Sequence, residues 1–366
     1  MSLCELRAVD ADFGLSGVIR TATSVMLCRR HYGPGTFEIH VPDNWAAPLL
    51  HAGRMIVING DPDRSGVVRG YKWESANGNA PEGWTITGYT LPGLMKQRIT
   101  VPPGDEESLG WDKVIGPAET AIKHYIRRNL ANPDNASRAM GPVMLAEDTG
   151  RGAGVAWRSR YEPLDEVVRA IGEYADMGIR ARLDLVKRRI VMDVEPGIDR
   201  TTQQDSRSPV VFDPRFSNIR SASYTYSVDG YSNTGYAGGA GEDENRLVYI
   251  LGNENAGMDR FETFIDCSGA EDIDDLKYYG GNRLAEKKET ETMEGSVLTD
   301  RAFLFGRDYD IGDKVTVRPK AGLELHTRIT GVKEVWEDTG YTCEPLFGTG
   351  VISLSDVLKQ MKAPVK

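Results

Sequence analysis

The fold is decided by a phrase that this chain of 366 residues contains twice, "AGRMIVI" at residues 52–58 and "IGDKVTV" at residues 311–317. In both copies a glycine precedes alternating apolar residues, the pattern of a β-strand with one buried face. Each copy also ends on a similar strand, at 83–91 and at 340–348. Two unrelated meanders could share one phrase by chance, but four elements recurring in the same order favour an internal duplication. Further glycines flank the copies at similar distances, Gly35 and Gly70 in the first, Gly295 and Gly331 in the second.

Each copy is predicted to form a small antiparallel β-barrel or split barrel. Turn-forming residues separate the expected strands at 59–66, 74–83, 318–325 and 337–340, and closing a sheet into a barrel removes its exposed edges. Glycine is abundant, at 40 residues against an aromatic fraction of 8%, which is typical of many short strands and turns. The expected fold class is α+β, mainly β: two similar barrels separated by an α+β domain.

The residues between the copies have helical periodicity. Apolar residues recur at helical spacing over 111–130, and the segment 163–178 begins with Pro163 and two acids and ends on Gly178, which predicts two helices. A hairpin turning near Lys187 is expected over 180–194. In the second copy, strands at 219–228 and 246–252 are expected to flank a polar loop. The predicted domains are a first barrel at 1–105, a middle domain at 106–205, a second barrel at 206–350 interrupted by a helix at 270–289, and a short C-terminal helix or tail at 351–366.

Composition excludes several classes of function. The formal net charge of −10 at pH 7 argues against binding to nucleic acid or an anionic membrane, since a binder must neutralise phosphates with Lys and Arg. Four cysteines without a CxxC pair indicate neither a zinc site nor a disulfide framework, and they fit a reducing compartment. We expect no signal peptide and no membrane span, because no basic start followed by an apolar run is present.

One segment resembles a calcium loop. In "DPDRSG", Asp61, Asp63, Ser65 and Gly66 match positions one, three, five and six of an EF-hand loop. Position twelve is Lys72, where a bidentate glutamate belongs, and a strand rather than a helix is expected to follow. We therefore interpret the segment as a β-turn.

The remaining candidate motifs favour structural roles. The glycine-rich stretches 149–157 and 236–245 lack the spacing of phosphate-binding loops and are interpreted as hairpin tips or contact loops, and the acids at 271–275 as charges that complement a helix dipole. No histidine belongs to a metalloprotease or nucleophile motif. The arginine pairs 29–30 and 127–128 are expected to be solvated or in salt bridges between subunits. We thus predict no catalytic, cofactor-binding or metal-binding residues; the histidines are His31, His40, His51, His124 and His326.

Three longer phrases resemble a known family. They are "DEVVRAIGEYADMGIRARLD" with "IVMDV" in the middle, "FDPRFSNIRSASYTYS" at the start of the second copy, and "YDIGDKVTV" with "TRITGVKEVWEDTGYTCEPLFG" at its end. Over nearly the whole chain, the pattern is similar to the baseplate hub or tail-associated proteins of long-tailed bacteriophages, including siphophage members. These are framework motifs, not catalytic signatures.

This resemblance implies a structural protein of a virion tail, assembled in the cytoplasm of the bacterial host. It implies a homotrimer that caps the tail tube, with the distal tail or tube protein on one side and fibre, spike or tip proteins on the other. Three subunits with two similar barrels each would offer six similar surfaces to a sixfold tube. DNA would pass through such a ring without being bound specifically, and no membrane anchor or enzymatic activity is implied.

Two alternatives remain at this point. A tail-associated cell-wall hydrolase, either a glycosidase or a peptidase, would need a cleft that pairs carboxylates or holds a metal. A carbohydrate-binding module at the tail tip would need exposed aromatic residues, such as Trp157, Tyr231 and Tyr236, on one concave face.

Overall fold

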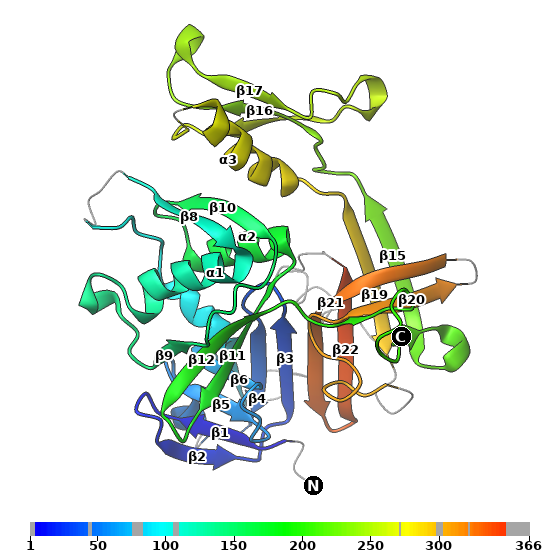
Figure 1. Ribbon diagram of the computed structural model, residues 1–366. Helices are drawn as coiled ribbons and strands as arrows, with labels where there is room; N and C mark the ends of the chain where they lie inside the picture. The colour runs from blue at the N-terminus through cyan, green and yellow to red at the C-terminus, as the bar shows by residue number, and fades with distance from the viewer. Residues whose placement is uncertain are drawn as a thin grey trace.

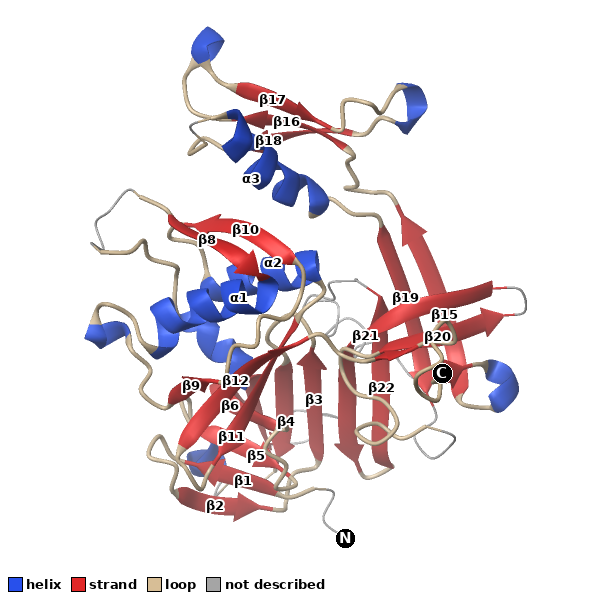
Figure 2. Ribbon diagram, in the orientation of Figure 1, coloured by secondary structure: helices blue, strands red, loops and turns tan. Residues whose placement is uncertain are grey.

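The computed structural model describes residues 4–42, 46–74, 83–104, 110–270, 272–297, 303–320 and 323–348. Most of the strands belong to one large sheet with the order β15-β19-β22-β21-β3-β4-β7-β6-β5-β1-β2. Figures 1 and 2 show this sheet at the base of the molecule, helices α1 and α2 above its N-terminal part, and a smaller module farther up. The protein is thus mainly β with few helices, as predicted.

The N-terminal strands form one half of the sheet. They are β1 (Leu6–Val9), β2 (Leu15–Ile19), β3 (Ser24–Arg30), β4 (Thr36–Val41), β5 (Met55–Ile58), β6 (Ser65–Glu74) and β7 (Gly83–Thr90). Along β4, Phe37, Ile39 and Val41 are buried and alternate with more exposed residues, as the period-two pattern predicts. We call this part the N-terminal unit.

The C-terminal strands form the other half, the C-terminal unit. Its strands are β15 (Ile219–Ser227), β19 (Thr290–Val297), β20 (Lys314–Lys320), β21 (Leu323–Glu337) and β22 (Gly340–Gly348), and β20 also pairs in parallel with β13 (Asp199–Arg200) and β14 (Val211–Phe212). The core of this unit gathers around Phe212, whose ring meets those of Tyr309 and Phe347 at 5.5 Å.

The two units repeat one strand order. The N-terminal unit runs β3-β4-β7-β6-β5, and the C-terminal unit runs β15-β19-β22-β21-β20 with the same antiparallel pairings. Each long strand has a register shift at the same place, between Val68 and Gly70 in β6 and between Ile329 and Gly331 in β21. These shared features support the internal duplication.

A shared glycine turn starts the repeated phrase in both units. Gly53 has φ 91° and Gly312 has φ 92°, a left-handed conformation that favours glycine. The N–H of each glycine donates to the backbone C=O of the residue before the register shift, Gly53 to Val68 at 2.9 Å and Gly312 to Ile329 at 2.8 Å. The glycine that opens each copy of the phrase therefore has a definite structural role.

One detail of the sequence alignment was wrong. The strand registers place Phe37 opposite Gly88 and Met293 opposite Phe347, and Gly88 and Phe347 occupy equivalent positions opposite the register shift. This makes Glu294 equivalent to Glu38, so Gly295 lies within β19 and is not the counterpart of Gly35. Glycines alone cannot fix a register, because a strand tolerates them at several positions.

The strand order of the large sheet is an open path in the described residues, not a closed ring. The second half of β21 pairs with β3, so the two units share one sheet edge to edge. The structure therefore shows two similar units but does not show the two separate barrels that the sequence predicted.

The middle segment packs on one face of the N-terminal unit. It contains β8 (Asp112–Pro117), α1 (Ala118–Ile126), β9 (Val143–Leu145), β10 (Gly154–Ser159), α2 (Leu164–Ala175), β11 (Gly178–Asp184) and β12 (Arg189–Glu195). One hydrophobic core joins Ile122 and Ile171 of its helices to Val57 and Val67 of the sheet. Short 3-10 helices lie at Ala47–Leu50, Leu91–Gln97, Ala136–Arg138, Pro214–Phe216, Asp243–Asn245 and Gly257–Asp259, and a π-helical turn at Arg127–Ala131 follows α1.

The helix predictions for the middle segment need two corrections. The first helix begins at Ala118, because the preceding residues form β8 and pair with β10. The second helix ends at Ala175, three residues before the predicted stop at Gly178. Asp176 takes the left-handed conformation after it, with φ 57°. Gly178 instead begins β11, whose hairpin with β12 was predicted correctly.

A small module is inserted between β15 and β19. It consists of β16 (Thr234–Gly238), β17 (Val248–Leu251), β18 (Glu262–Asp266) and α3 (Ile273–Ala285), and Figure 1 shows it at the top of the molecule. The polar loop expected at 229–245 was wrong in part, since β16 lies within it and is paired on both edges. The glycines that suggested a loop make room for close packing: a Cβ at Gly235 would meet Ile265 of β18 at 2.7 Å and Leu284 of α3 at 3.4 Å.

Helix α3 packs against the middle segment through an arginine that stacks on aromatic rings from both. The guanidinium of Arg158 lies 4.5 Å from the ring centre of Trp111 and 4.0 Å from that of Tyr279. Arg283 of α3 reaches Glu162 at 3.1 Å. Stacking on aromatic faces lets a buried arginine keep its charge. The module is therefore attached to the middle segment as well as to the sheet.

No described helix is long and apolar enough to cross a membrane. The helix or tail predicted at 351–366 lies outside the described residues, as do most of the turn predicted at 74–83 and part of the one at 318–325.

A buried ion cluster holds α1 to the loop that precedes β10. Glu119 and Lys123 are fully buried and 2.6 Å apart, and Arg151 reaches Glu119 at 2.9 Å. Burial alone would raise the pKa of Glu119, but hydrogen bonds from Arg151 and Lys123 hold it well below its usual value.

We expect Glu119→Gln to lower the free energy of unfolding by roughly 1–3 kcal/mol, because it removes one of the two carboxylates that hold the buried Lys123 ammonium and leaves only Asp193, at 2.8 Å. Since the folded-state pKa is lowered, this contribution is present above the unfolded value near 4.5 and is lost as the pH falls below it. Urea titrations between pH 7 and 3 measure both effects. Glu166→Gln, at an exposed acid of α2, is the control, and equal stability of the two variants at pH 7 would contradict the assignment.

Candidate functional site

The two units meet along β3 and β21. Seven residue pairs join the strands in antiparallel register, from Ser24 opposite Glu337 to Arg30 opposite Gly331. Figure 2 shows β3 and β21 side by side near the centre of the sheet. This junction is the feature that a duplicated, ring-forming protein would need, because it fixes how one unit follows the next.

A buried glutamate lies at the middle of the junction. Glu334 of β21 is fully buried and accepts hydrogen bonds from Arg29 of β3 at 2.7 Å, from Arg64 at 2.9 Å and from Tyr341 at 2.8 Å. Burial would raise the pKa of Glu334, but the charges of Arg29 and Arg64 lower it below its usual value. Two arginines from the N-terminal unit thus hold one carboxylate of the C-terminal unit.

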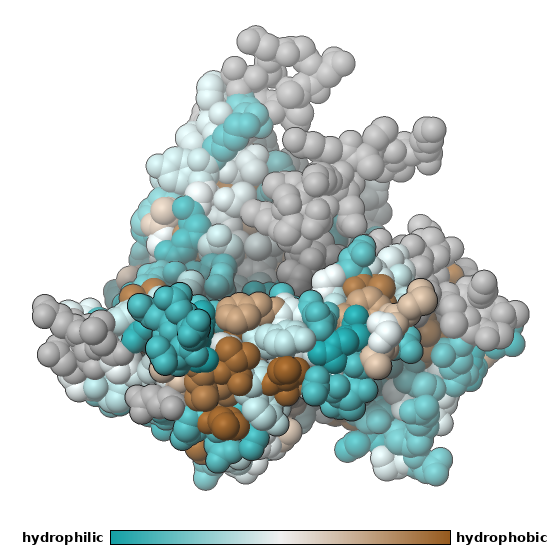
Figure 3. Space-filling view, turned by 90° about the horizontal axis from the view of Figure 1, so that it is seen from above, coloured by the Kyte–Doolittle hydropathy of each residue, from teal (hydrophilic) through white to brown (hydrophobic). Residues whose placement is uncertain are grey.

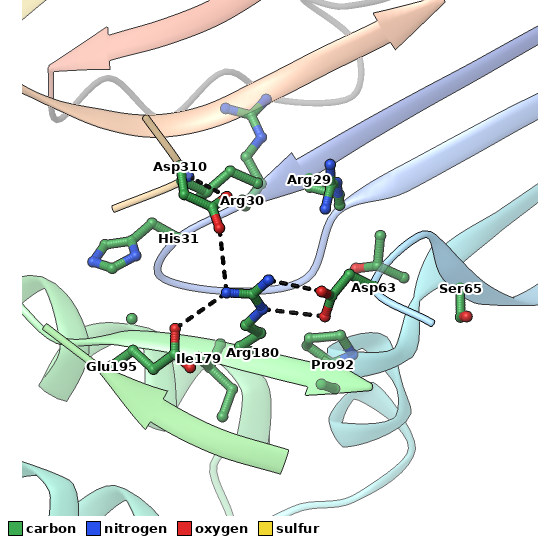
Figure 4. A pocket seen from close by; sticks show the side chains of 14 residues that line it. Arg29, Arg30, His31, Asp63, Ser65, Pro92, Ile179, Arg180, Glu195 and Asp310 are labelled. Carbon is green, nitrogen blue, oxygen red and sulfur yellow. Dashed lines mark hydrogen bonds and ion pairs between the residues drawn. The ribbon is translucent and has the colours of Figure 1, made fainter. Parts of the chain in front are cut away.

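Arg180 connects all three parts of the chain. Its guanidinium contacts Asp63 of the N-terminal unit at 2.7 Å, Asp310 of the C-terminal unit at 3.3 Å and Glu195 of β12 at 3.5 Å. Figure 4 shows Arg180 at the centre of these three carboxylates, in a cavity of about 60 Å³. The space fits a few water molecules. Arg180 therefore sets the middle segment at a fixed position under the junction.

His31, at the turn after β3, fills the corner beside this cavity. It is buried, and burial lowers its pKa to about 3, so the ring is neutral at ordinary pH. A Cβ at Gly178 would lie 2.1 Å from the ring, and one at Gly312 would lie 2.5 Å from it. Both glycines are therefore needed for space, and the His31 ring packs between them.

Two strand edges that correspond to this junction pair with no further strand in the described part of the chain. Beyond the register shift, residues Gly70–Glu74 of β6 pair only with β7 among the described strands, and β15 is the last strand of the sheet. Their counterparts in the other unit are the second half of β21 and strand β3, which pair with each other. Each chain thus has one closed junction and the two halves of a second.

The module presents a different kind of surface. Phe264 and Val248 are 58% and 50% exposed on the side of the sheet opposite α3, and Arg246 lies 5.2 Å from the Phe264 ring centre. Figure 3, turned by 90° from Figure 1, shows hydrophobic residues gathered between hydrophilic ones on the upper side of the molecule. An exposed apolar patch is typical of a surface that binds another protein.

The calcium-like segment is a turn, as predicted. Arg64 N–H donates to Asp61 C=O at 3.0 Å, and the Asp61 side chain accepts from Asp63 N–H at 2.9 Å. The Asp63 carboxylate binds Arg180 and Arg182. No group of three or more His, Cys, Asp or Glu residues in the described part of the chain is arranged to hold a metal.

Several other predicted features have clear positions. Arg151, in the glycine-rich stretch 149–157, binds Glu119 through its side chain and backbone N–H, so this part of the stretch is held against α1 within the chain. Asp272 accepts from Asp275 N–H at 2.8 Å and caps α3, in agreement with the dipole interpretation. Arg29 is not solvated, which was one of the two expectations for it: it binds buried Glu334 within the chain.

In the described residues, the aromatic and carboxylate groups that the two alternative functions would use are not arranged as those functions require. Trp157 is buried in the core, so it cannot line an exposed face with Tyr231 and Tyr236. The three carboxylates around the central cavity, those of Asp63, Glu195 and Asp310, all bind Arg180. Burial would raise the pKa of Asp63, but hydrogen bonds and charges from Arg180 and Arg182 lower it, whereas a glycosidase acid needs a raised pKa.

Sequence reasoning missed the junction itself. A usable signal was present in "TGVKEVW", where Glu334 occupies a position that alternation assigns to the buried face of a strand. A buried charge requires a partner, and Arg29 and Arg64 supply it.

We expect Glu334→Gln to lower the free energy of unfolding by roughly 3–5 kcal/mol, since Arg29 and Arg64 lose their buried counter-charge. The lowered pKa means that the wild-type contribution disappears as the pH falls below about 4.5, the usual value for this group. Denaturant unfolding of the variant, compared with Glu337→Gln at an exposed position of the same strand, measures this. A loss no greater than that of the control would show that the junction does not depend on Glu334.

Comparisons with known proteins agree with this architecture. The model of the family described as Siphovirus ReqiPepy6 Gp37-like protein matches residues 5–349, whereas a comparison with curated sequences finds no match. A tail protein from Neisseria meningitidis MC58 has a similar fold, with TM-score 0.55, 14% identity, and coverage of 97% of this chain and 98% of that one. The 43 kDa tail protein of prophage MuSo2 from Shewanella oneidensis has TM-score 0.55 at 12% identity, covering 94% and 97%, and a prophage tail protein from Listeria monocytogenes EGD-e has 0.53 at 11%, covering 98% of each chain. The chain therefore belongs to the siphovirus Gp37-like family, and it shares its fold with solved tail proteins.

Proposed function

We propose that this protein is the hub of a siphovirus or prophage tail, a homotrimer whose six similar units form one ring between the tail tube and the tail tip. The single observation that carries this proposal is the junction of β3 with β21, together with the matching open edges of β6 and β15. Membership of a tail protein family agrees with it.

The type of interface between the two units favours a ring. Within one chain the C-terminal unit follows the N-terminal unit through two different strands, so the contact is heterologous. If the next chain follows in the same way, each added unit repeats one rotation, and a rotation that closes produces a ring. Three chains of two units each then present six similar surfaces.

Under this proposal the barrel predicted from the sequence is one large closed sheet made by three chains, not two small barrels within each. Closure would pair the edges of β6 and β15 that the isolated chain leaves open. The divisions predicted at 1–105, 106–205 and 206–350 then correspond to a first ring unit, a buttress and a second ring unit that carries the inserted module.

The proposed partners follow from symmetry and charge. A ring of six similar units fits a sixfold tail tube or distal tail protein, and the modules and the middle segments, three of each, fit fibre, spike or tip proteins. The net charge of −10 suits a wall along which DNA passes without binding. We assign the protein a structural role in the virion tail, with assembly in the host cytoplasm, and no catalytic activity.

The native mass of the purified protein tests this proposal. We expect three times the 40.4 kDa of one chain, and negative-stain images with a central channel. A protein that stays monomeric at every concentration and in the presence of its tail tube partner would contradict the hub. Release of sugar or peptide fragments from purified cell walls would support the hydrolase instead.

A further inference from the structure

We propose that neighbouring subunits join by pairing β6, at residues Gly70–Glu74, with β15 of the next copy, through aromatic residues instead of the ion pairs used within the chain. This inference rests on the trimer proposed above and names the surface that holds it together. The occupant of both open edges is therefore a second copy of this chain.

The register of this pairing follows from the duplication. The shared register shifts make Gly70 of β6 equivalent to Gly331 of β21, so Tyr71 corresponds to Val332 and Trp73 to Glu334. Tracing the pairs through β4 and β19 makes Thr225 of β15 equivalent to Cys28 of β3, and Tyr226 equivalent to Arg29.

Applying the internal pairing to these equivalents gives a specific ladder between subunits. Within the chain, Val332 lies opposite Arg29 and Lys333 opposite Cys28. Between chains, Tyr71 then lies opposite Tyr226 of the partner subunit, and Lys72 opposite Thr225 of the partner subunit. The same ladder places Trp73 opposite Tyr224 of the partner subunit.

The chemistry of the two junctions differs. At the internal junction Glu334 and Arg29 are an ion pair, with the Glu334 carboxylate fully buried. Their counterparts are Trp73 and Tyr226, which are 46% and 53% exposed, and Tyr71 is 60% exposed. Tyr71 and Trp73 share one face of β6, with the Tyr71 and Trp84 rings 6.0 Å apart.

Aromatic residues in place of buried ion pairs are physically reasonable at an interface that forms after folding. A chain that exposes tyrosine and tryptophan remains soluble before assembly, and these side chains bury large areas afterwards, which is why they dominate protein interfaces. Buried ions would need complete desolvation at the moment of association. Lys72 and Glu74, on the same edge and joined at 2.5 Å, are the charged residues that protect an open edge from aggregation.

Aromatic truncation tests the chemistry of the junction. We expect Tyr71→Ala and Trp73→Ala each to raise the dissociation constant of the trimer about 30-fold or more. Light scattering across a dilution series measures this, and unchanged thermal unfolding of the dissociated chain shows that folding is intact. Tyr278→Ala, at a residue of α3 that is also 60% exposed, is the control and should leave the trimer unchanged.

Paired cysteines test the register. In the double variant Lys72→Cys with Thr225→Cys, oxidation should link subunits into covalent dimers and trimers, because directly opposite strand residues lie within disulfide distance. Lys72→Cys with Ser227→Cys is the control, since a shift of two residues along the strand adds about 6.7 Å. The native cysteines are buried and give no such background.

The possible results separate this inference from the hub itself. A trimer that survives both aromatic truncations, or that links equally through position 227, would overturn the proposed junction and leave the hub standing. A wild-type monomer would overturn both. Dissociation by raising NaCl from about 0.1 to 1 M would also contradict an aromatic junction, because such concentrations screen exposed ion pairs and not apolar contacts.

Discussion

The pairing of strand edges is the constraint on which the rest of this structure depends. An open edge exposes backbone N–H and C=O groups that bind any strand of suitable shape, so a protein must cover or use it. This chain uses one such pair of edges internally, where β3 meets β21. The duplication guarantees that a second, equivalent pair exists, because each unit contributes one edge of each type.

The junction is specific because charged groups fix its register. Sliding β21 by two residues along β3 would move Glu334 away from Arg29 and Arg64 and leave a carboxylate buried without a partner. Arg180 and His31 then set the angle between the parts, since one contacts carboxylates from all three and the other fits only against Gly178 and Gly312. Together they fix how the two units of one chain are joined, which in the proposed ring would be its first step.

The sequence predicted the parts of this fold that depend on local patterns. Alternation and turn residues located the repeated strands, and the hairpin near Lys187 was correct because its turn is short and local. The strand β8 was interpreted as helix because Val114 and Ala118 happen to fit a helical period, and only pairing with β10 decides between the two. The edge-to-edge junction joins residues about 300 positions apart, so the local pattern could mark Glu334 as a buried charge but could not identify its partners.

The two units differ most in one hairpin, and in the proposed ring that difference would turn a sixfold arrangement into a threefold one. Residues 31–35 connect β3 to β4 by a short turn, whereas residues 228–289 connect the equivalent strands β15 and β19 through the whole module. In a ring of three chains every second unit carries a module, always at the same ends of the strands. The opposite ends, where the turn after Glu337 lies beside Ser24, carry no insertion of this size in the described residues. One side of such a ring therefore keeps six similar surfaces while the other has three large ones, and a single insertion into one copy of a duplicated unit is sufficient to produce that change.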